Sequence, residues 1–382
     1  MTETVTSVAQ ATDLVNLSGL EELLERLQID AFVCRSGMNV SYLSGIASPG
    51  TLGRHLDLAD TPREVFVIWP AAGDPIVVLS EIASQLARAT SRIARHEIYR
   101  DYADSPEEKL ATTLRDLGLA GSRVGLDLAW FGARRWNTLE RLLPDLKAVD
   151  CTDGLDLVRA VKTPAEVTRL RRAAAVLDQT FMDVFPTVRV GDSERDIHAR
   201  LVARAIQLGI SSIHGILQGS SNRVLYGGES DARLGPGDLV RTDYVAYVDG
   251  YAANLSRLLC VGPPTAEVRE RYAIYLDIYR RAVDLLRPGT VGGRIHRAIR
   301  DLLLARGWEA NPPISGHGIG IWFHQQRPLL VDSSTDVLQA GMVLAIEPIS
   351  GHWHLQDEYV ITDGAPERIS DSFDLEELPW AG

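Results

Sequence analysis

Gly237–Asp243 (GDLVRTD) and Gly250–Arg257 (GYAANLSR) follow one another closely in the chain and combine apolar strand residues with a few polar ones. The run Val240–Val245 is typical of a buried strand, and Asp243 interrupts it. A carboxylate in such a run costs free energy unless it binds a cation or accepts hydrogen bonds at its oxygens. Asp243 on its own therefore predicts either a functional site or an acid paired with backbone groups or an arginine.

Three further segments carry polar side chains beside glycine or apolar residues: Gly316–Gly320 (GHGIG), Gly341–Pro348 (GMVLAIEP) and Leu355–Thr362 (LQDEYVIT). In the first, His317 stands between two glycines, and His324 follows seven residues later. In the second, an apolar run ends at Glu347. Two acids and a glycine-flanked histidine in separate segments are explained better by one shared site than by separate structural contacts.

The composition excludes several classes of function. The 382 residues carry 39 Lys and Arg against 51 Asp and Glu, a net charge of −12, which argues against nucleic acid or anionic membrane as partner. Hydrophobic residues make up 45% and charged residues 24%, as in a globular protein of two or three domains. We expect no secretion signal and no membrane span. The widely spaced Cys34, Cys151 and Cys260 predict reduced, buried thiols in a cytoplasmic protein.

The domain organisation follows from a helix start at Thr163-Pro164-Ala165-Glu166, where Thr is the N-cap, Pro the first helical residue and Glu the third. The apolar stripe of this helix is Leu170, Ala173, Ala174, Leu177 and Phe181. A boundary just before it predicts a flexible tail over residues 1–12, an N-terminal domain over 13–157 and a second domain over 158–382.

The N-terminal domain shows an alternating α/β pattern. We expect helices over Leu17–Leu27, Glu107–Leu117 and Arg134–Leu142, strands over Asp30–Cys34, Val65–Trp69, Ile76–Leu79, Arg123–Asp127 and Ala148–Thr152, and a turn over Ser36–Asn39. The second and third strands are expected to form a hairpin.

The second domain contains an internal echo at an offset of 98 residues. The matches are Arg189-Val190-Gly191 with Arg287-Pro288-Gly289, Ile197-His198 with Ile295-His296, and Gly209 with Gly307. Each copy has a turn glycine, an amphipathic helix and a glycine that ends the helix. The pattern predicts a duplicated half-unit with a cleft where the halves meet.

Taken together, these segments resemble the signature of the pita-bread family, which includes methionine aminopeptidase, Xaa-Pro aminopeptidase and prolidase, and creatinase. Ile29–Val33 with Asn39–Gly45 is similar to the opening of the creatinase/prolidase N-terminal domain, and Arg159–Glu166 resembles its junction with the catalytic domain. The resemblance implies an α+β fold, with a pita-bread C-terminal catalytic domain preceded by a smaller α/β creatinase-type domain.

The resemblance also implies a set of metal-ligand positions, from which this chain departs. Two Asp, one His and two Glu hold two divalent ions in the metallopeptidases, and the matching positions here are Asp243, Asn254, His317, Glu347 and Gln356. The two amides replace the carboxylates that bridge the ions, and hard cations prefer carboxylate oxygen. We therefore expect no metal cofactor, while one weakly bound divalent ion on Asp243, His317 and Glu347 stays open.

Two further departures concern the substrate. The upstream histidine of the family, which polarises the scissile group in metallopeptidases and acts as acid and base in creatinase, corresponds to Tyr226. Creatinase is itself metal-free and binds the guanidinium group of its substrate with two carboxylates. The residues at the corresponding positions here are Ser256 and Gln356. Both are neutral, so another small C–N compound fits better than creatine.

General acid–base catalysis with water as the nucleophile is still possible without the replaced metal ligands and substrate-binding carboxylates. Histidine titrates near neutral pH, and a carboxylate can orient it. The expected proton-transfer residues are His317, His324, Glu347 and Asp243. The expected hydrogen-bond donors to developing charge are Tyr226, Asn254 and Gln356. For His324, a structural contact beside Trp322 and Phe323 is the alternative.

Four more side chains are weaker candidates for substrate binding: Arg257, Trp322, Trp353 and Arg54. Arg257 could instead form an ion pair with Asp243 or Glu347, and the tryptophans could pack in the core. Arg54 would bind a carboxylate in the partner's site of a creatinase-like dimer, or be a solvated surface residue. The segment Ser350–His354 (SGHWH) is interpreted as a loop at the cleft mouth and not as a metal pair.

The leading hypothesis is a metal-independent, creatinase-like hydrolase that cleaves a C–N bond in a small molecule and forms a homodimer. The alternatives are an Xaa-Pro-type metallopeptidase with one metal ion, a non-catalytic pseudoenzyme that binds a ligand or protein, and a lyase or cyclase in a specialised pathway.

Overall fold

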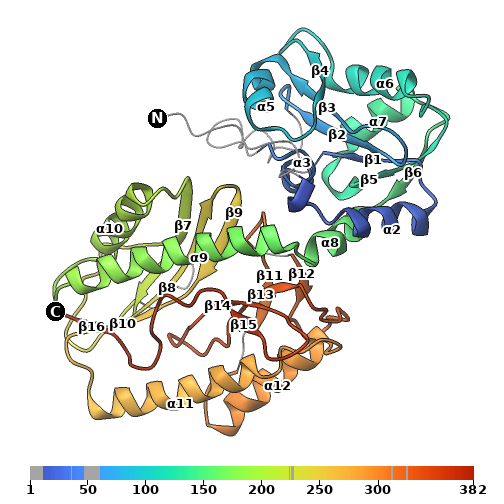
Figure 1. The fold of residues 1–382 in the computed structure, drawn as a ribbon. Helices are drawn as coiled ribbons and strands as arrows, with labels where there is room; N and C mark the ends of the chain where they lie inside the picture. The colour runs from blue at the N-terminus through green and yellow to red at the C-terminus, as the bar shows by residue number, and fades with distance from the viewer. Residues whose placement is uncertain are drawn as a thin grey trace. The chain divides into compact units, whose positions relative to one another are not determined.

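The computed structural model describes residues 12–35, 37–46, 61–222, 224, 228–310, 313–323 and 326–382 (Figure 1). Contacts divide the chain into an N-terminal unit, Met1–Arg159, and a C-terminal unit, Ala160–Gly382. The boundary predicted at residue 157 lies inside helix α8 (Thr152–Ala160). The tail expected over residues 1–12 lies outside the described residues except for Thr12, which begins a short 3-10 helix, Thr12–Leu14.

The N-terminal unit is built on a six-stranded sheet in the order β4-β3-β2-β1-β5-β6. The strands are β1 (Ala31–Cys34), β2 (Val65–Pro70), β3 (Ile76–Ser80), β4 (Arg95–Tyr99), β5 (Arg123–Leu126) and β6 (Lys147–Asp150). β2 and β3 form the antiparallel hairpin that the sequence predicts. β1 pairs in parallel with β5, and every residue of β1 is buried, as expected of an apolar strand covered on both faces.

Helices complete the N-terminal unit: α2 (Leu17–Leu27), α3 (Gly37–Ser44), α5 (Ser84–Thr90), α6 (Pro106–Asp116), α7 (Ala133–Leu142) and α8. Leu110 and Leu114 of α6 and Leu139 of α7 lie in one core with the sheet residues. The predicted helices at Leu17, Glu107 and Arg134 are confirmed.

The turn predicted over Ser36–Asn39 is wrong, because α3 begins at Gly37. Asn39 suggested a turn, yet it is buried in this helix and its amide donates to Asp127 Oδ2 at 2.9 Å. The same carboxylate accepts the backbone N–H of Arg35 at 2.9 Å. A distant acid thus satisfies the polar group that would otherwise favour a turn.

All three cysteines are free and buried. Burial raises the pKa of each thiol above its ordinary value. Among the described residues, no helix combines the length and the apolar character that crossing a membrane requires.

The C-terminal unit begins with the long helix α9 (Pro164–Val184), which starts as the sequence predicts. Thr163 accepts a hydrogen bond from the backbone of Glu166, and the Glu166 side chain accepts one from the backbone of Thr163, so the capping box is complete. The predicted stripe from Leu170 to Phe181 is buried. Figure 1 shows α9 running across strands β8 and β9, with which it is in contact.

Two five-stranded sheets form the body of this unit. The first has the order β16-β10-β8-β7, with β9 paired to β8, and the second has the order β12-β11-β13-β14-β15. Their strands are β7 (Ser212–Gly219), β8 (Leu239–Val248), β9 (Tyr251–Leu255), β10 (Leu258–Val261), β11 (Gly316–Gly318), β12 (Gln326–Leu329), β13 (Val343–Ile346), β14 (Asp357–Val360), β15 (Glu367–Arg368) and β16 (Trp380–Ala381). An isolated antiparallel bridge, Ser256 to Gln356, connects the two sheets.

The internal echo corresponds to two similar successions of elements. α10 (Glu194–Gln207) precedes β7, and α12 (Gly292–Ala305) precedes β11, while α11 (Ala266–Val283) separates the copies. Gly209 and Gly307 follow the two helices at φ values of 96° and 71°, which favour glycine. The sheets of the two copies meet at the bridge between Ser256 and Gln356.

Candidate active site

The first part of the candidate site is the hairpin of β8 and β9. Asn254 lies opposite Val245 in the register, which brings its side chain beside that of Asp243. The Asn254 amide donates to Asp243 Oδ1 at 2.9 Å and to the Tyr244 carbonyl at 3.2 Å. The Asn254 backbone N–H donates to Glu358 Oε1 at 2.8 Å. These contacts hold Asn254 with its amide hydrogens directed at Asp243.

The second part is His317 on β11, together with Gln356. His317 Nδ1 lies 3.0 Å from the Gly318 carbonyl, which can only accept, and this contact is a hydrogen bond in the tautomer that carries its proton on Nδ1. His317 Nε2 then offers a lone pair, to which the Gln356 amide donates at 3.3 Å. The same amide donates to Asn254 Oδ1 at 3.1 Å, and that oxygen lies 3.2 Å from His317 Nε2. The two amides and the imidazole form one network.

The third part is Glu347, which follows β13 and is only 4% exposed. Its Oε2 lies 3.3 Å from His354 Nε2, and its Oε1 lies 3.9 Å from His317 Nε2. Within the described part of the chain, Oε1 has no hydrogen-bond partner. Ser256 Oγ lies 3.1 Å from His354 Nδ1 and completes a buried row of Glu347, His354 and Ser256. Glu347 therefore keeps one acceptor oxygen ready for a proton or a substrate group.

The residues at the five family ligand positions do not fit a pair of metal ions. The Asn254 amide directs a hydrogen at Asp243 Oδ1, and the Gln356 amide directs one at His317 Nε2, which are the lone pairs a cation would need. Asp243 and Glu347 alone carry negative charge among the five positions. Over the described ranges, no group of three or more His, Cys, Asp or Glu residues could hold a metal ion.

Comparison with known proteins gives the family. Residues 168–371 match the profile of metallopeptidase family M24, and residues 17–161 match that of the creatinase/prolidase N-terminal domain. The chain belongs to metallopeptidase family M24. It therefore has the predicted pita-bread catalytic domain behind a creatinase-type domain, and the predicted resemblance is confirmed.

Three proteins illustrate the similarity. The chain is 31% identical to the probable dipeptidase PepE of Mycobacterium tuberculosis (strain ATCC 25618 / H37Rv), over 79% of this chain and 82% of the relative. It is 25% identical to the Xaa-Pro dipeptidase of Lactobacillus delbrueckii subsp. lactis, over 85% of this chain and 89% of the relative. The crystal structure of the X-Pro aminopeptidase from Thermotoga maritima covers 96% of this chain and 99% of its own with a TM-score of 0.80, and at 19% identity it shows the fold alone.

The substrate-binding role predicted for Arg257 does not fit its surroundings in this M24 chain. Arg257 is fully buried and donates to Asp178 Oδ1 at 2.6 Å and to Asp357 Oδ1 at 2.8 Å. The ion pair with Asp243 or Glu347 that the sequence analysis offers as the alternative is also wrong. Two acids from α9 and β14 neutralise this guanidinium, so its role is structural.

The two tryptophans occupy different settings. Trp353 packs against Trp308 at a ring-centroid distance of 5.4 Å and against Tyr275 at 5.8 Å, so it belongs to the core and not to an apolar substrate wall. Trp322 lies 6.5 Å from Tyr247, which is on β8 four residues beyond Asp243, and thus on the same face of the strand. Trp322 stays a candidate for substrate contact.

Three predicted residues, Tyr226, His324 and Arg54, lie outside the described residues. Conversely, the structure brings His354 into the site, which the sequence analysis assigns to a loop at the cleft mouth. The spacing to Gln356 could have predicted this placement. His354 precedes Gln356 by two residues, and residues i and i+2 of an extended segment lie on the same face.

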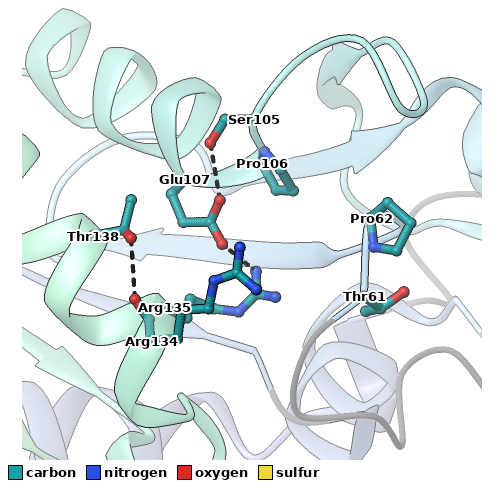
Figure 2. A pocket seen from close by; sticks show the side chains of 8 residues that line it. All are labelled: Thr61, Pro62, Ser105, Pro106, Glu107, Arg134, Arg135 and Thr138. Atoms are coloured by element: carbon teal, nitrogen blue, oxygen red, sulfur yellow. Dashed lines mark hydrogen bonds and ion pairs between the residues drawn. The ribbon is translucent and has the colours of Figure 1, made fainter.

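A separate cavity of about 470 Å³ lies in the N-terminal unit (Figure 2). Its lining residues are Thr61, Pro62, Ser105, Pro106, Glu107, Arg134, Arg135 and Thr138. Arg135 forms ion pairs with Glu107 at 2.7 Å and with Glu64 at 3.0 Å. None of the candidate active-site residues lines this cavity.

Proposed function

We propose that this M24 protein hydrolyses an amide C–N bond in a small, peptide-like molecule, and that dipeptides of the Xaa-Pro type are the first class to test. The probable dipeptidase at 31% identity and the Xaa-Pro dipeptidase at 25% identity support a peptidase. The observation that carries the proposal is the buried set of Glu347, His317 and His354, in which one oxygen of Glu347 is left without a partner in the described chain.

The chemistry proposed for this set needs no group beyond the chain and water. The 3.9 Å between Glu347 Oε1 and His317 Nε2 exceeds a hydrogen bond, and a water or substrate oxygen between them would contact both. Glu347 accepts a proton as the water oxygen attacks the carbonyl carbon. The C–N bond then breaks, and the proton that Glu347 took from the water passes through His354 or His317 to the leaving nitrogen, which returns the site to its starting state and gives an acid and an amine.

This proposal differs from the creatinase-like reading in its substrate, since the relatives favour a peptidase. The family is described as metallopeptidases, so the metal-free reaction belongs to the proposal and rests on the amides at Asn254 and Gln356. A homodimer and a cytoplasmic location stay predictions from the sequence.

The test is an assay of the purified full chain on Ala-Pro and Leu-Pro, with Ala-Ala and creatine for comparison, in EDTA and with added Mn²⁺. We expect Xaa-Pro turnover that persists in EDTA and is lost in E347Q, because this variant removes the proton acceptor. The matched control is E367Q, which changes an exposed glutamate of β15. Turnover only with Mn²⁺ would favour the one-ion metallopeptidase, and no turnover of any dipeptide would overturn the peptidase proposal.

A further inference from the structure

Arg241 is the third residue of β8, two residues before Asp243. Side chains alternate along a strand, so Arg241 and Asp243 are on the same face, the face that carries the candidate site. Arg241 is 4% exposed. The site therefore includes a buried cation that the sequence analysis does not single out.

The hydrogen bonds of Arg241 leave most of its guanidinium unused. Within the described chain, Nη1 donates to the Gly351 carbonyl at 3.4 Å, and neither Nε nor Nη2 makes a hydrogen bond. No carboxylate of the described residues lies within ion-pair distance of it. The edge formed by Nε and Nη2 is the one that receives a carboxylate side-on through two parallel hydrogen bonds.

The other buried arginines of the described chain all have an acidic partner. Arg35 pairs with Glu64 at 2.9 Å, Arg135 with Glu107 at 2.7 Å and Arg257 with Asp178 at 2.6 Å, and Arg159 pairs with Asp156. A buried charge without a partner is costly, and in native proteins such a group calls for a specific explanation. Arg241 is thus the buried arginine whose partner has to come from outside the described residues.

Gln218 provides a second, independent observation. It lies directly opposite Arg241 in the register of β7 and β8, so the two side chains are on one face. Gln218 is 2% exposed, and its Nε2 donates to the Asn222 carbonyl at 2.7 Å and to the Val224 carbonyl at 3.2 Å. Its Oε1 has no hydrogen-bond partner in the described chain. A donor and an acceptor thus lie side by side without partners.

We propose that Arg241 determines specificity by binding a carboxylate of the substrate, while Gln218 Oε1 accepts a hydrogen bond from an N–H or O–H of the same molecule. This inference rests on the proposed function for the substrate class, a small amide or dipeptide with a free carboxylate. The single positive charge of Arg241 matches one carboxylate. Burial and, secondarily, the charge of Arg241 lower the pKa of His352, so that side chain adds no second cation at neutral pH.

The test compares Ala-Pro with its C-terminal amide, which differ only in the carboxylate, by calorimetric binding to the full chain carrying E347Q. With Arg241 present, the acid is expected to bind about 10- to 100-fold more tightly than the amide, as for hydrogen bonds to a charged group. R241M is expected to abolish this preference and to leave amide binding unchanged. The matched control, R233M, replaces an exposed arginine of the same unit and should keep the preference.

A second measurement separates this inference from the proposed function. Acetate at constant ionic strength, with chloride as reference, should raise the Tm of the wild type and not that of R241M. R241M itself should fold, because it breaks no ion pair. A dependence on Arg241 without dipeptide turnover supports the inference and overturns the peptidase proposal. Turnover with equal use of acid and amide, or no acetate effect on the wild type, overturns the inference.

Discussion

Asn254 is the residue whose replacement should change the protein most informatively. Its amide donates to Asp243 Oδ1 at 2.9 Å, and N254D would place a second carboxylate oxygen at that distance. The side chain keeps its shape, so the change is one of charge and hydrogen bonding. N254D removes a donor, adds a negative charge and restores one of the acids that the pita-bread resemblance implies at this position.

The size of the effect follows from the distance. Two unit charges 2.9 Å apart repel by about 6 kcal/mol at an effective dielectric constant of about 20. The pair can escape by binding a proton, which at pH 7 costs about 4 kcal/mol for an aspartate of ordinary pKa. Binding a proton costs less free energy than the repulsion, so it sets the upper limit of the destabilisation. N254D should therefore lower the free energy of unfolding by about 4 kcal/mol at pH 7. The loss should shrink toward pH 5, because protonation is then cheaper.

Urea unfolding of the wild type, N254D and the double variant N254D/Q356E, in EDTA and in Mn²⁺, measures this effect. Both variants should be destabilised in EDTA, and Mn²⁺ should restore stability, most fully in the double variant. The matched control is N222D, because the Asn222 amide donates to Glu194 Oε2 at 2.9 Å in a setting without the other ligand positions. N222D should be destabilised without rescue by Mn²⁺.

Three results would refute the reasoning. N254D could be as stable as the wild type in EDTA, which would mean that the Asn254 amide does not hold Asp243. Mn²⁺ could rescue N222D as well as N254D, which would make the rescue nonspecific. Calorimetry could also show two Mn²⁺ ions bound to the wild type as tightly as to the double variant, and the amides would then not prevent a two-metal site.

Three further predictions concern the surroundings of the site. Burial raises the pKa of Glu358 well above its ordinary value, so the folded chain retains a proton that the unfolded chain loses. The free energy of unfolding should therefore fall as the pH rises above about 4.3, by up to about 1.4 kcal/mol per pH unit until the folded pKa is reached. Urea unfolding at pH 5 and 8 should show that the stability of E358Q depends less on pH than that of the wild type. R257M should lose about 3–5 kcal/mol in the same assay because two buried acids lose their cation, and an effect as small as that of R241M would contradict this. H354A should reduce kcat by about 10²–10⁴-fold on any substrate found, because it removes a group proposed to transfer a proton. H352A is the control, and equal effects of the two substitutions would show that His354 does not transfer the proton.

Local patterns in the sequence predict much of the fold and part of the site. The start of α9 needs only Thr163 and Glu166, which bond to each other, and the buried strands β8 and β13 follow from short apolar runs. Asn254 and Gln356 could be recognised as amides at acidic positions only through the pita-bread resemblance, which implies ligand positions in segments that follow one another in a known order.

Partners far apart in the sequence could not be predicted in this way. Arg257 pairs with Asp178 and Asp357, which are 79 and 100 residues away, and the choice depends on how α9 and β14 pack around it. The lack of an acidic partner for Arg241 among the described residues is likewise a property of the packed sheet, because the 51 acids of the sequence give no sign of which arginines they reach. Polar residues in the interior are specified by tertiary contacts more than by local pattern.

The three buried thiols have a practical consequence for spectroscopy. Thiolate is the reactive form of cysteine, and burial disfavours it at Cys34, Cys151 and Cys260, so the native chain should hardly react with maleimide dyes at neutral pH. Cysteines introduced at exposed alanines, such as A129C in the N-terminal unit and A305C at the end of α12, would then be labelled selectively. A donor and acceptor dye at these two points would report the distance between the units, and its change on ligand binding, without removing any native cysteine.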